Sequence, residues 1–260
     1  MKFWSLCSGS SGNCTYIGDR DCGVLVDAGI SAKRISQLLD MNGISGKSIA
    51  AIFVTHEHSD HICGLYTLAA KLGVPVVASQ QTLSALENLR PITKFKTEII
   101  DNKPFNIGDI EVIRFQTSHD CAGSSGYRFN FSSGKSAAVC TDLGIVTDEV
   151  RHGVLGSDIV LFESNHDLKM LKNGPYPPYL KLRIMGDNGH LSNNMCAAEL
   201  SKMLESGTTR FVLGHLSQHN NLPLLAKNAA TGALADINAV EDEDYILNIA
   251  APTGNKVIYL

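Results

Sequence analysis

Three histidines and one aspartate fall within six residues of the segment VTHEHSDHICG, residues 54–64, although the whole chain has only nine histidines. They follow the pattern HxHxDH and are His56, His58, Asp60 and His61. Such a cluster cannot build an apolar core and repels itself when its rings carry protons, so something must compensate it. Imidazole nitrogens and carboxylate oxygens are ligands of zinc and of its first-row neighbours. In a turn that leaves a strand, the first two histidines can bind one ion, while the aspartate and the third histidine can serve a second.

Two metal sites need more ligands than this cluster offers, so distant parts of the chain must supply the rest. Three candidates each follow an apolar run: His119 in TSHD, Asp142 in CTD and His215 in LGHLS. The ends of strands are where sites are assembled in sheet proteins. Alone, either histidine would more often be structural and the aspartate a turn residue, but the dense HxHxDH cluster favours a metal site. Cys63 and Cys121 are interpreted as packed thiols. We therefore expect two divalent ions per chain, either zinc, manganese or iron.

Apolar periodicity indicates a mixed α and β chain whose strands end at these candidates. Strands are expected at residues 2–7, 23–29, 49–55, 74–79, 109–120, 125–142, 158–167, 210–221 and 255–260. Helices are expected at residues 31–43, 64–73, 81–89, 193–207 and 223–234. A Gly/Ser loop, residues 8–13, separates the first two strands, and the interval 167–189 with its three prolines is interpreted as loop-rich.

The composition is that of an ordinary globular protein, expected to form one domain over residues 1–260. The chain is 44% hydrophobic and 18% charged, and its net charge of −4 attracts no nucleic acid overall, so such a contact needs a local patch. Its seven cysteines are odd in number and form no CxxC pair, which fits reduced thiols in a cytosol. The N-terminus is not a signal peptide, and no apolar run is long enough for a bilayer. We therefore expect a cytoplasmic protein without membrane contact.

HxHxDH followed by a distant His, Asp and His resembles the metallo-β-lactamase superfamily, and the resemblance covers essentially the whole chain, including the early strand VLVDAG. It implies an α+β fold, a four-layer α/β/β/α sandwich with the active site at the edge between two mixed β-sheets. The first metal of that superfamily has ligands that correspond to His56, His58 and His119. The second metal has ligands that correspond to Asp60, His61 and His215. The bridging carboxylate corresponds to Asp142.

Longer motifs narrow the resemblance to the YycJ/VicX (WalJ) family of bacterial nucleases and, more distantly, to ribonuclease Z. They are SLCSGSSGNCTYI, THEHSDHICGL, FESNHD, LKNGPYPPYLKLRI, GHLSN and LGHLSQHNN. The resemblance implies a DNA nuclease of the 5′-to-3′ exonuclease type, in which a metal-bridging hydroxide attacks phosphorus. The chain lacks the long Gly/Pro-rich arm of ribonuclease Z and the large insertion of β-CASP nucleases, which disfavours tRNA maturation and β-CASP roles.

Two residues are predicted to be catalytic, Asp60 and His190. GHLSN, which contains His190, resembles the motif by which ribonuclease Z assists at the scissile phosphate, and a protonated histidine there can stabilise charge or protonate the leaving oxygen. Glu163 and His166, both in FESNHD, are expected to orient metal ligands.

Two segments are expected to contact the substrate. Backbone N–H groups of the Gly/Ser loop can face a phosphate, at Ser10, Ser11, Gly12 and Asn13. The interval 167–189 combines positive charge with tyrosine rings, a mixture that suits a nucleic-acid strand. Its proposed contacts are Lys181 and Arg183. DNA is favoured over RNA as the substrate.

Two other functions stay open at this stage. One is a thioesterase or lactonase of the same fold that acts on a small ester. The other is a metal-bound regulatory protein linked to two-component signalling, against which a nearly complete ligand set argues. The sequence assigns no role to His152 or His219 and predicts no oligomeric state.

Overall fold

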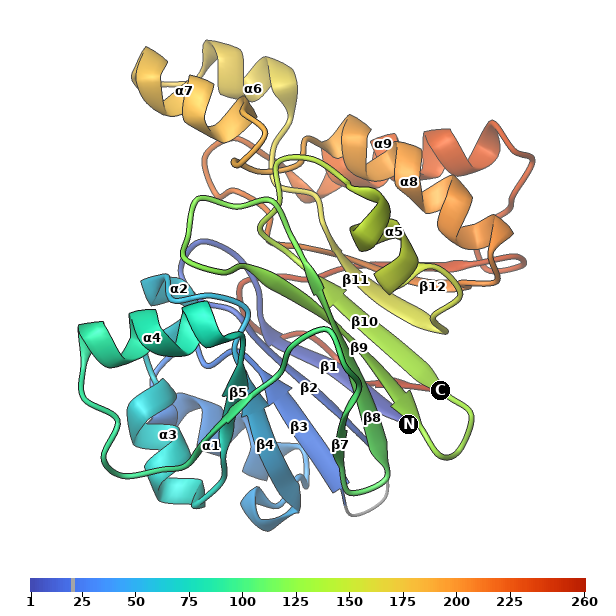
Figure 1. Cartoon of the computed structure of the whole chain (residues 1–260). Helices are drawn as coiled ribbons and strands as arrows, with labels where there is room; N and C mark the ends of the chain where they lie inside the picture. The colour runs from blue at the N-terminus through green and yellow to red at the C-terminus, as the bar shows by residue number, and fades with distance from the viewer. Residues whose placement is uncertain (20–21) are drawn as a thin grey trace.

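Two β-sheets pack face to face, and helices cover both outer faces (Figure 1). The structure is a computed structural model that describes residues 1–19 and 22–260, and within this part each sheet has seven strands. The first sheet contains, in spatial order, β14 (Ile258–Tyr259), β1 (Lys2–Cys7), β2 (Cys14–Asp19), β3 (Cys22–Val26), β4 (Ile49–Phe53), β5 (Val76–Ala78) and β6 (Thr97–Ile99). The second contains β13 (Ile246–Ile249), β12 (Arg210–Gly214), β11 (Ile159–Glu163), β10 (Ser136–Cys140), β9 (Ser125–Phe131), β8 (Ile110–Gln116) and β7 (Phe105–Ile107).

The helices form the two outer layers. Those beside the first sheet are α1 (Ala32–Met41), the short turn η1 (Gly46–Ser48), α2 (Ser59–Ile62), α3 (Leu65–Leu72) and α4 (Gln80–Leu89). Those beside the second sheet are α5 (Asp148–Val154), α8 (Asn193–Glu205) and α9 (Pro223–Ala235), while α6 (Leu168–Asn173) and α7 (Pro178–Met185) project beyond the layers. Hydroxyl side chains start several of them by accepting a backbone N–H three residues on, as at Ser31, Ser79, Thr147 and Ser192. This arrangement confirms the expected α+β fold and its α/β/β/α sandwich.

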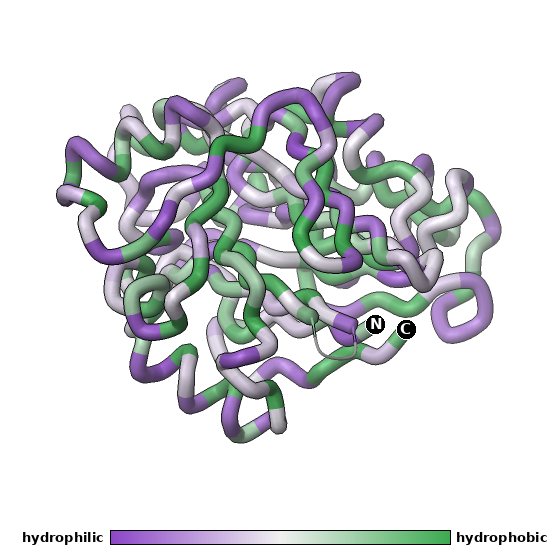
Figure 2. Tube along the Cα trace, turned by 60° about the horizontal axis from the view of Figure 1, so that its bottom comes forward, coloured by the Kyte–Doolittle hydropathy of each residue, from purple (hydrophilic) through white to green (hydrophobic). Residues whose placement is uncertain are grey.

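Three apolar layers join the four structural layers. Between the sheets, the ring of Phe53 on β4 meets the rings of Tyr127 and Phe129 on β9, with centroids 5.4 and 5.3 Å apart. A second layer lies under α1, α3 and α4, and a third under α5, α8 and α9. Figure 2 shows hydrophobic stretches concentrated in the inner strands and hydrophilic stretches in many outer turns. The expectation of one domain over residues 1–260 stays a prediction.

Parallel pairing brings several strand ends to one edge. In the first sheet β3, β4 and β5 run parallel, and in the second sheet β10, β11 and β12 do. Polar segments that follow such strands meet at their carboxyl edge, where α/β proteins place their sites. The fold therefore brings together residues that are far apart in the sequence.

The expectation that residues 167–189 form loops is wrong, because this interval contains α6 and α7. Asp167 caps α6 by accepting the N–H of Met170 at 2.8 Å, and Pro178 occupies the first turn of α7. Proline is tolerated at a helix start because the N–H that it lacks has no partner there. The prolines that indicated loops therefore mark a helix beginning.

The length and apolarity of the helices decide whether any of them could span a membrane. Among residues 1–19 and 22–260, no helix combines the length and the apolarity needed to cross a bilayer. The cytoplasmic location stays a prediction.

Candidate metal centre

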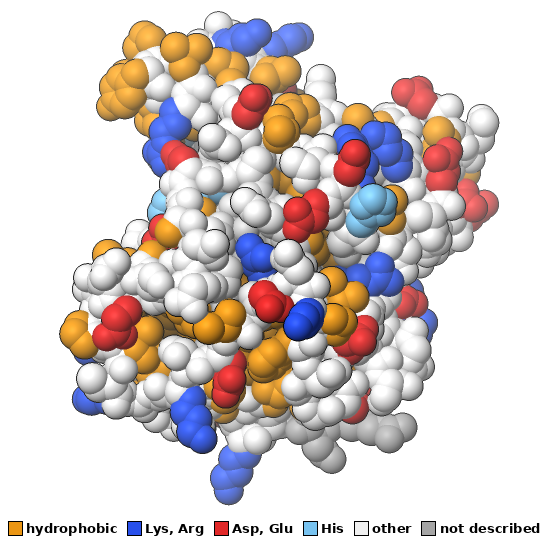
Figure 3. Space-filling view, viewed as in Figure 1, with side chains coloured by type: hydrophobic (Ala, Val, Ile, Leu, Met, Phe, Trp, Pro, Cys, Tyr) orange, Lys and Arg blue, Asp and Glu red, His pale blue; other side chains and the backbone are white. Residues whose placement is uncertain are grey.

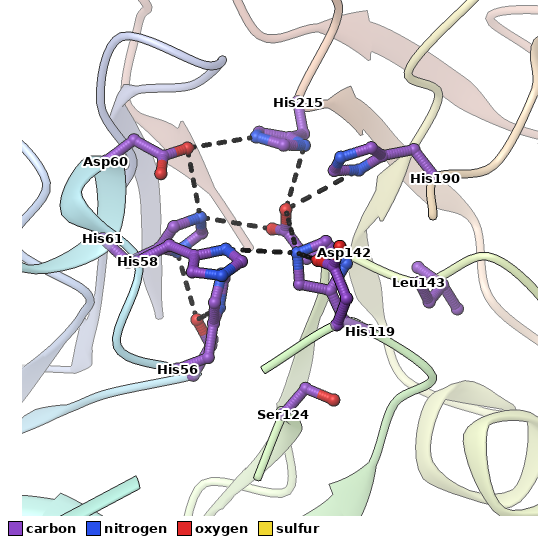
Figure 4. Close-up of polar contacts among 12 residues, drawn as sticks. His56, His58, Asp60, His61, His119, Ser124, Asp142, Leu143, His190 and His215 are labelled. Carbon is purple, nitrogen blue, oxygen red and sulfur yellow. Dashed lines mark hydrogen bonds and ion pairs between the residues drawn. The ribbon is translucent and has the colours of Figure 1, made fainter. Parts of the chain in front are cut away.

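The residues expected to bind metal converge at the edge between the two sheets (Figure 4). His56 and His58 follow β4. Asp60 and His61 lie in α2, which comes directly after them. The second sheet contributes the loop after β8, the residues after β10 and those after β12. These segments carry, respectively, His119, Asp142 and His215.

The first group of candidate ligands is His56, His58 and His119, whose ligand atoms lie within 4.8 Å of one another. His58 Nδ1 is 3.3 Å from His119 Nε2. Two nitrogens that bind one zinc ion at tetrahedral angles are about 3.3 Å apart, given Zn–N bonds of about 2.0–2.1 Å. The spacing of this pair therefore fits a shared ion.

The second group is Asp60, His61 and His215. Asp60 Oδ2 lies 3.5 Å from His61 Nε2 and 3.6 Å from His215 Nε2. Asp142 stands between the two groups, since its carboxylate lies 3.3 Å from His61 Nε2 and 3.8 Å from His119 Nε2. The structure thus brings the seven expected ligands into one cluster, with the aspartate after β10 in a bridging position.

The Nδ1 atoms of five rings have oxygen partners that fix which nitrogen is available. His56 Nδ1 lies 3.0 Å from the Thr55 hydroxyl, and His119 Nδ1 lies 3.1 Å from the Gly189 carbonyl. His61 Nδ1 is 2.7 Å from Asp27 Oδ2. Carbonyl and carboxylate oxygens only accept hydrogen bonds, and the Thr55 hydroxyl donates its one proton to Asp27, so Nδ1 carries a proton in each ring and Nε2 faces the centre. The remaining two rings, His190 and His215, are held in the same way by one glutamate.

That glutamate is Glu163, at the end of β11, and it is fully buried. Its Oε1 accepts from His215 Nδ1 at 2.7 Å and from His190 Nδ1 at 2.9 Å, while Oε2 accepts the backbone N–H of Leu143 and Leu191. A single carboxylate therefore contacts a candidate ligand and the neighbouring histidine, and the orienting role of Glu163 stays a prediction.

Some buried polar atoms of the cluster have no hydrogen-bond partner among the described residues, and a cation would fit them. Within the described part of the chain, three such atoms are His56 Nε2, Asp142 Oδ2 and His215 Nε2. Each comes from a different strand end, and Figure 4 shows these side chains converging on one space. Unpaired buried polar atoms are costly, and a metal ion would satisfy all three. The residues present therefore fit one or more divalent ions.

The buried carboxylates of the cluster also favour positive charge beside them. Burial alone would raise the pKa of Asp142, but His215 and His61 outweigh it and hold the pKa well below its usual range. Burial alone would lower the pKa of His215, yet the neighbouring carboxylates raise it to about 10. Burial and the adjacent rings hold the pKa of His56 well below its usual range, which keeps that imidazole neutral as a ligand must be. Metal binding at this cluster would therefore release protons.

Asp27 is a functional residue that the sequence did not assign. It follows β3 in VLVDAG, is 2% exposed, and accepts hydrogen bonds from the Thr55 hydroxyl and backbone N–H as well as from His61. The motif VLVDAG was part of the superfamily resemblance and could have drawn attention to this carboxylate. Asp27 thus holds both His61 and, through Thr55, His56.

Three residues of the centre have left-handed backbone conformations. Their φ angles are 62° for Asp27, 60° for Asp142 and 54° for His215. Residues other than glycine rarely adopt such angles, and each costs on the order of 1 kcal/mol or more. Each of these residues lies just past a strand end, so the strain turns its side chain into the centre.

The Gly/Ser loop contributes differently from what was expected. The N–H of Gly12 donates to Gly9 O at 2.9 Å, and the N–H of Asn13 donates to Asp60 O at 2.8 Å. Neither amide is therefore free for a phosphate, and only Ser10 and Ser11, which are exposed, keep that prediction. The side chain of Asn13 instead reaches the centre, where its Nδ2 lies 3.2 Å from His61 Nε2.

Other expected residues lie around the centre. Arg183 forms an ion pair with Asp120, which follows His119 in the chain. Lys181 Nζ donates to the carbonyl oxygen of Lys172 at 2.7 Å. His166 was expected to orient a ligand, but neither of its ring nitrogens has a hydrogen-bond partner in the described part of the chain. Burial lowers the pKa of His166 to about 4, so it is a neutral, enclosed ring and not a support for the ligands.

Comparison with known proteins assigns the family. Residues 23–216 match the beta-lactamase superfamily domain. Exodeoxyribonuclease YycJ of Bacillus anthracis is 38% identical over 240 residues, which cover 91% of this chain and 90% of that protein. The chain belongs to the YycJ/WalJ family of the β-lactamase superfamily. Exodeoxyribonuclease WalJ of Streptococcus pneumoniae serotype 2 (strain D39) is 37% identical over 258 residues, which cover 97% of this chain and 95% of that protein.

A solved structure agrees with this fold. Human tRNase Z, short form, superimposes with a TM-score of 0.66 at 16% identity and covers 100% of this chain and 99% of its own. At that identity the likeness shows the fold alone. Family membership makes the chain a hydrolase, with a His/Asp cluster capable of binding metal.

Proposed function

We propose that the protein hydrolyses phosphodiester bonds in DNA as a 5′-to-3′ exonuclease and uses two divalent metal ions. The observation that carries this proposal is the place of His190, which Glu163 orients at 2.9 Å beside the ligand cluster. Its ring centroid lies 5.3 Å from that of His215 and 5.0 Å from that of His119, so it borders the centre without being among the seven expected ligands. The names of the two relatives, both exodeoxyribonucleases, support DNA as the substrate.

Two ions are proposed because two of the candidate ligand groups share no residue. His56, His58 and His119 would hold one ion, and Asp60, His61 and His215 would hold the other, with Asp142 between them. Ligation by imidazole and carboxylate suits zinc, manganese or iron. When bound, the ions supply Lewis acidity and a water of lowered pKa.

The chain's own residues would manage the proton and the developing charge. Burial alone would lower the pKa of His190, but Glu163 outweighs it and raises the pKa, which favours the protonated ring. Nδ1–H is fixed on Glu163, which leaves Nε2–H to donate to the leaving oxygen or to a phosphate oxygen. The side chain of Asp60 is 22% exposed and lies 3.5 Å from His61 Nε2. We propose that its carboxylate takes part in the reaction as well as in metal binding.

A choice between ester substrates tests the proposal. The protein, loaded with zinc or with manganese, is assayed on bis-p-nitrophenyl phosphate, on an acyl thioester, and on duplex DNA labelled at the 5′ or the 3′ end. We expect hydrolysis of the phosphodiester and release of nucleotides from the 5′ end, both blocked by a chelator. Brisk thioester hydrolysis without cleavage of any phosphodiester would make the protein a thioesterase instead.

A further inference from the structure

Helix α7 is unusual because none of its side chains is buried. Tyr179 is 73% exposed, Leu182 is 68% exposed and Met185 is 36% exposed. These residues are three apart, so they lie along one face of the helix. A helix on a globular protein ordinarily buries its apolar stripe, and neighbouring exposed apolar side chains mark a contact surface.

The same segment is basic in an acidic protein. Residues 168–185 contain four basic side chains and no acidic one, whereas the chain carries a net charge of −4. Of these, Lys169 and Lys172 on α6 are exposed and have no ion-pair partner among the described residues. Figure 3 shows hydrophobic and basic side chains gathered together over the projecting α6 and α7. A strand of nucleic acid matches this combination of positive charge and stacking surface.

Contacts at its base join α7 to the metal centre. The carbonyl oxygen of Ile184 accepts the backbone N–H of His190 at 2.9 Å. Arg183 pairs with Asp120, which is adjacent to His119. Figure 3 shows a notch below α6 and α7 in which histidine side chains are visible. A strand lying on α7 would therefore lead into the centre.

The surface continues from α7 toward the loop after β12. The ring of Tyr176 meets that of His219 edge to face, with centroids 6.0 Å apart. His219, to which the sequence assigned no role, is exposed and lies four residues after His215. The ring pair thus extends the stacking surface to a second side of the centre.

We propose that α6 and α7 bind an unpaired segment of the DNA substrate, with Tyr179 and Leu182 against its bases and Lys169 and Lys172 at its phosphates. The inference rests on the proposed function and adds that the DNA bound at this surface is single-stranded. Base faces are open to aromatic side chains only in single strands, since stacking covers them in a duplex. A second copy of the chain fits poorly, because a symmetric contact through this surface would bring like charges together.

Equilibrium binding tests the inference without turnover. The metal-loaded protein is titrated into a fluorescein-labelled thymidine 12-mer with hydrolysis-resistant phosphorothioate linkages, and anisotropy is recorded. Tyr179→Ala is expected to weaken binding about tenfold or more, the usual effect of losing one base-stacking ring. The matched control is Tyr259→Ala, because Tyr259 is 68% exposed on β14 outside this segment, and it should bind as the wild type does. Leu182→Ala is compared likewise with Leu224→Ala, whose side chain is 66% exposed.

The charge component has its own measurement. Lys172→Ala should lower the slope of log affinity against log salt concentration by about 0.7, the value for one phosphate contact on a single strand. Lys96→Ala removes an exposed lysine outside α6 and α7 and should leave the slope unchanged.

Three results would overturn the inference. One is equal affinity of Tyr179→Ala and wild type for the 12-mer. Another is a blunt duplex that binds as tightly as the single strand and loses as much affinity in the variant. The third is a lower molar mass of Tyr179→Ala than of wild type by sedimentation, while its affinity for DNA is intact. That result would assign the surface to a second copy of the chain. Hydrolysis of bis-p-nitrophenyl phosphate is measured in parallel. If the wild type cleaves no phosphodiester, the proposed function fails, while the binding result still decides the role of α7.

Discussion

Asp27 Oδ2 lies 2.7 Å from His61 Nδ1, and both side chains are buried at the base of the candidate metal centre. The carboxylate fixes the ring so that Nε2 faces Asp60 and Asp142. Mutation of a residue that hydrogen-bonds to a metal ligand commonly lowers metal affinity by about 10–100-fold.

Replacing Asp27 by Asn should therefore weaken metal binding by about 10–100-fold, because the amide has no charge and can turn an N–H toward the ring. The measurement is competition for zinc with a chromophoric chelator. Asp40→Asn, at an exposed position on α1, serves as the matched control and should bind zinc as the wild type does. Equal affinities in the two variants would remove Asp27 from the metal centre.

His190→Ala should reduce phosphodiester turnover by about 10²–10⁴-fold, the usual contribution of a general acid, with metal content unchanged. A purely structural role as the cap of α8 does not apply, because Ser192 accepts the N–H of Met195 there. Turnover, metal stoichiometry and melting temperature are measured on one preparation. The control is His152→Ala, which removes an exposed histidine on α5. Unchanged turnover with a lower melting temperature would contradict the catalytic role of His190.

Elemental analysis of the reconstituted protein should give two transition-metal ions per chain. Asp142→Ala should lower the number of bound ions and abolish most of the activity, because Asp142 lies between the two ligand groups. A stoichiometry of one ion in the wild type would restrict the centre to a single ligand set.

Chelation should lower the melting temperature, because the ligands come from both sheets and an ion that binds only the folded state stabilises it. The stabilisation is about 2.7 kcal/mol when free metal exceeds its Kd a hundredfold. Calorimetry with and without added zinc measures the shift, and magnesium at the same concentration is the control. A melting temperature independent of zinc would mean that the folded protein does not bind it.

An ion pair away from the centre predicts a pH-dependent stability. Glu199 on α8 accepts from Arg151 at 3.0 and 3.1 Å and from Lys202 at 2.9 Å. Burial alone would raise the pKa of Glu199, but these hydrogen bonds lower it. The stabilisation is therefore present above the unfolded-state pKa of about 4.3 and is lost as the pH falls through the lower folded-state value.

Glu199→Gln should thus melt at a lower temperature than wild type at pH 7, and the difference should shrink as the pH falls below about 4. Glu205→Gln, at the exposed last residue of the same helix, controls for loss of charge alone. A difference that stays constant from pH 7 to pH 3.5 would contradict the ionic origin.

Local spacing explains why much of the metal centre could be predicted from the sequence. HxHxDH follows a buried strand directly, so its side chains must leave the sheet together, and His119, Asp142 and His215 occupy equivalent places after other strands. Asp27 could not be assigned in this way, because its partner His61 is 34 residues away and only pairing between β3 and β4 brings them together. The same applies to the amide of Asn13, whose partner is the carbonyl oxygen of Asp60, 47 residues away.

The fold was predicted best where side chains are buried. The helix at residues 81–89 agrees with α4 because its apolar spacing reflects packing. In α7 no side chain is buried, and the prolines around its start were misleading. Strand β2 was missed because CTYIGD follows a Gly/Ser segment and is short. The prolines thus hid the helix in the segment that we propose binds the substrate.

The left-handed conformations of Asp27, Asp142 and His215 have a consequence for engineering this protein. Glycine at any of them would relieve backbone strain. At Asp142 and His215 it would also remove a buried polar atom that has no hydrogen-bond partner in the described structure. Relief of backbone strain alone would therefore act on residues of the candidate metal centre, a trade-off between stability and activity. Thermostable variants of this chain should be sought with activity as a second criterion, or with metal present throughout selection.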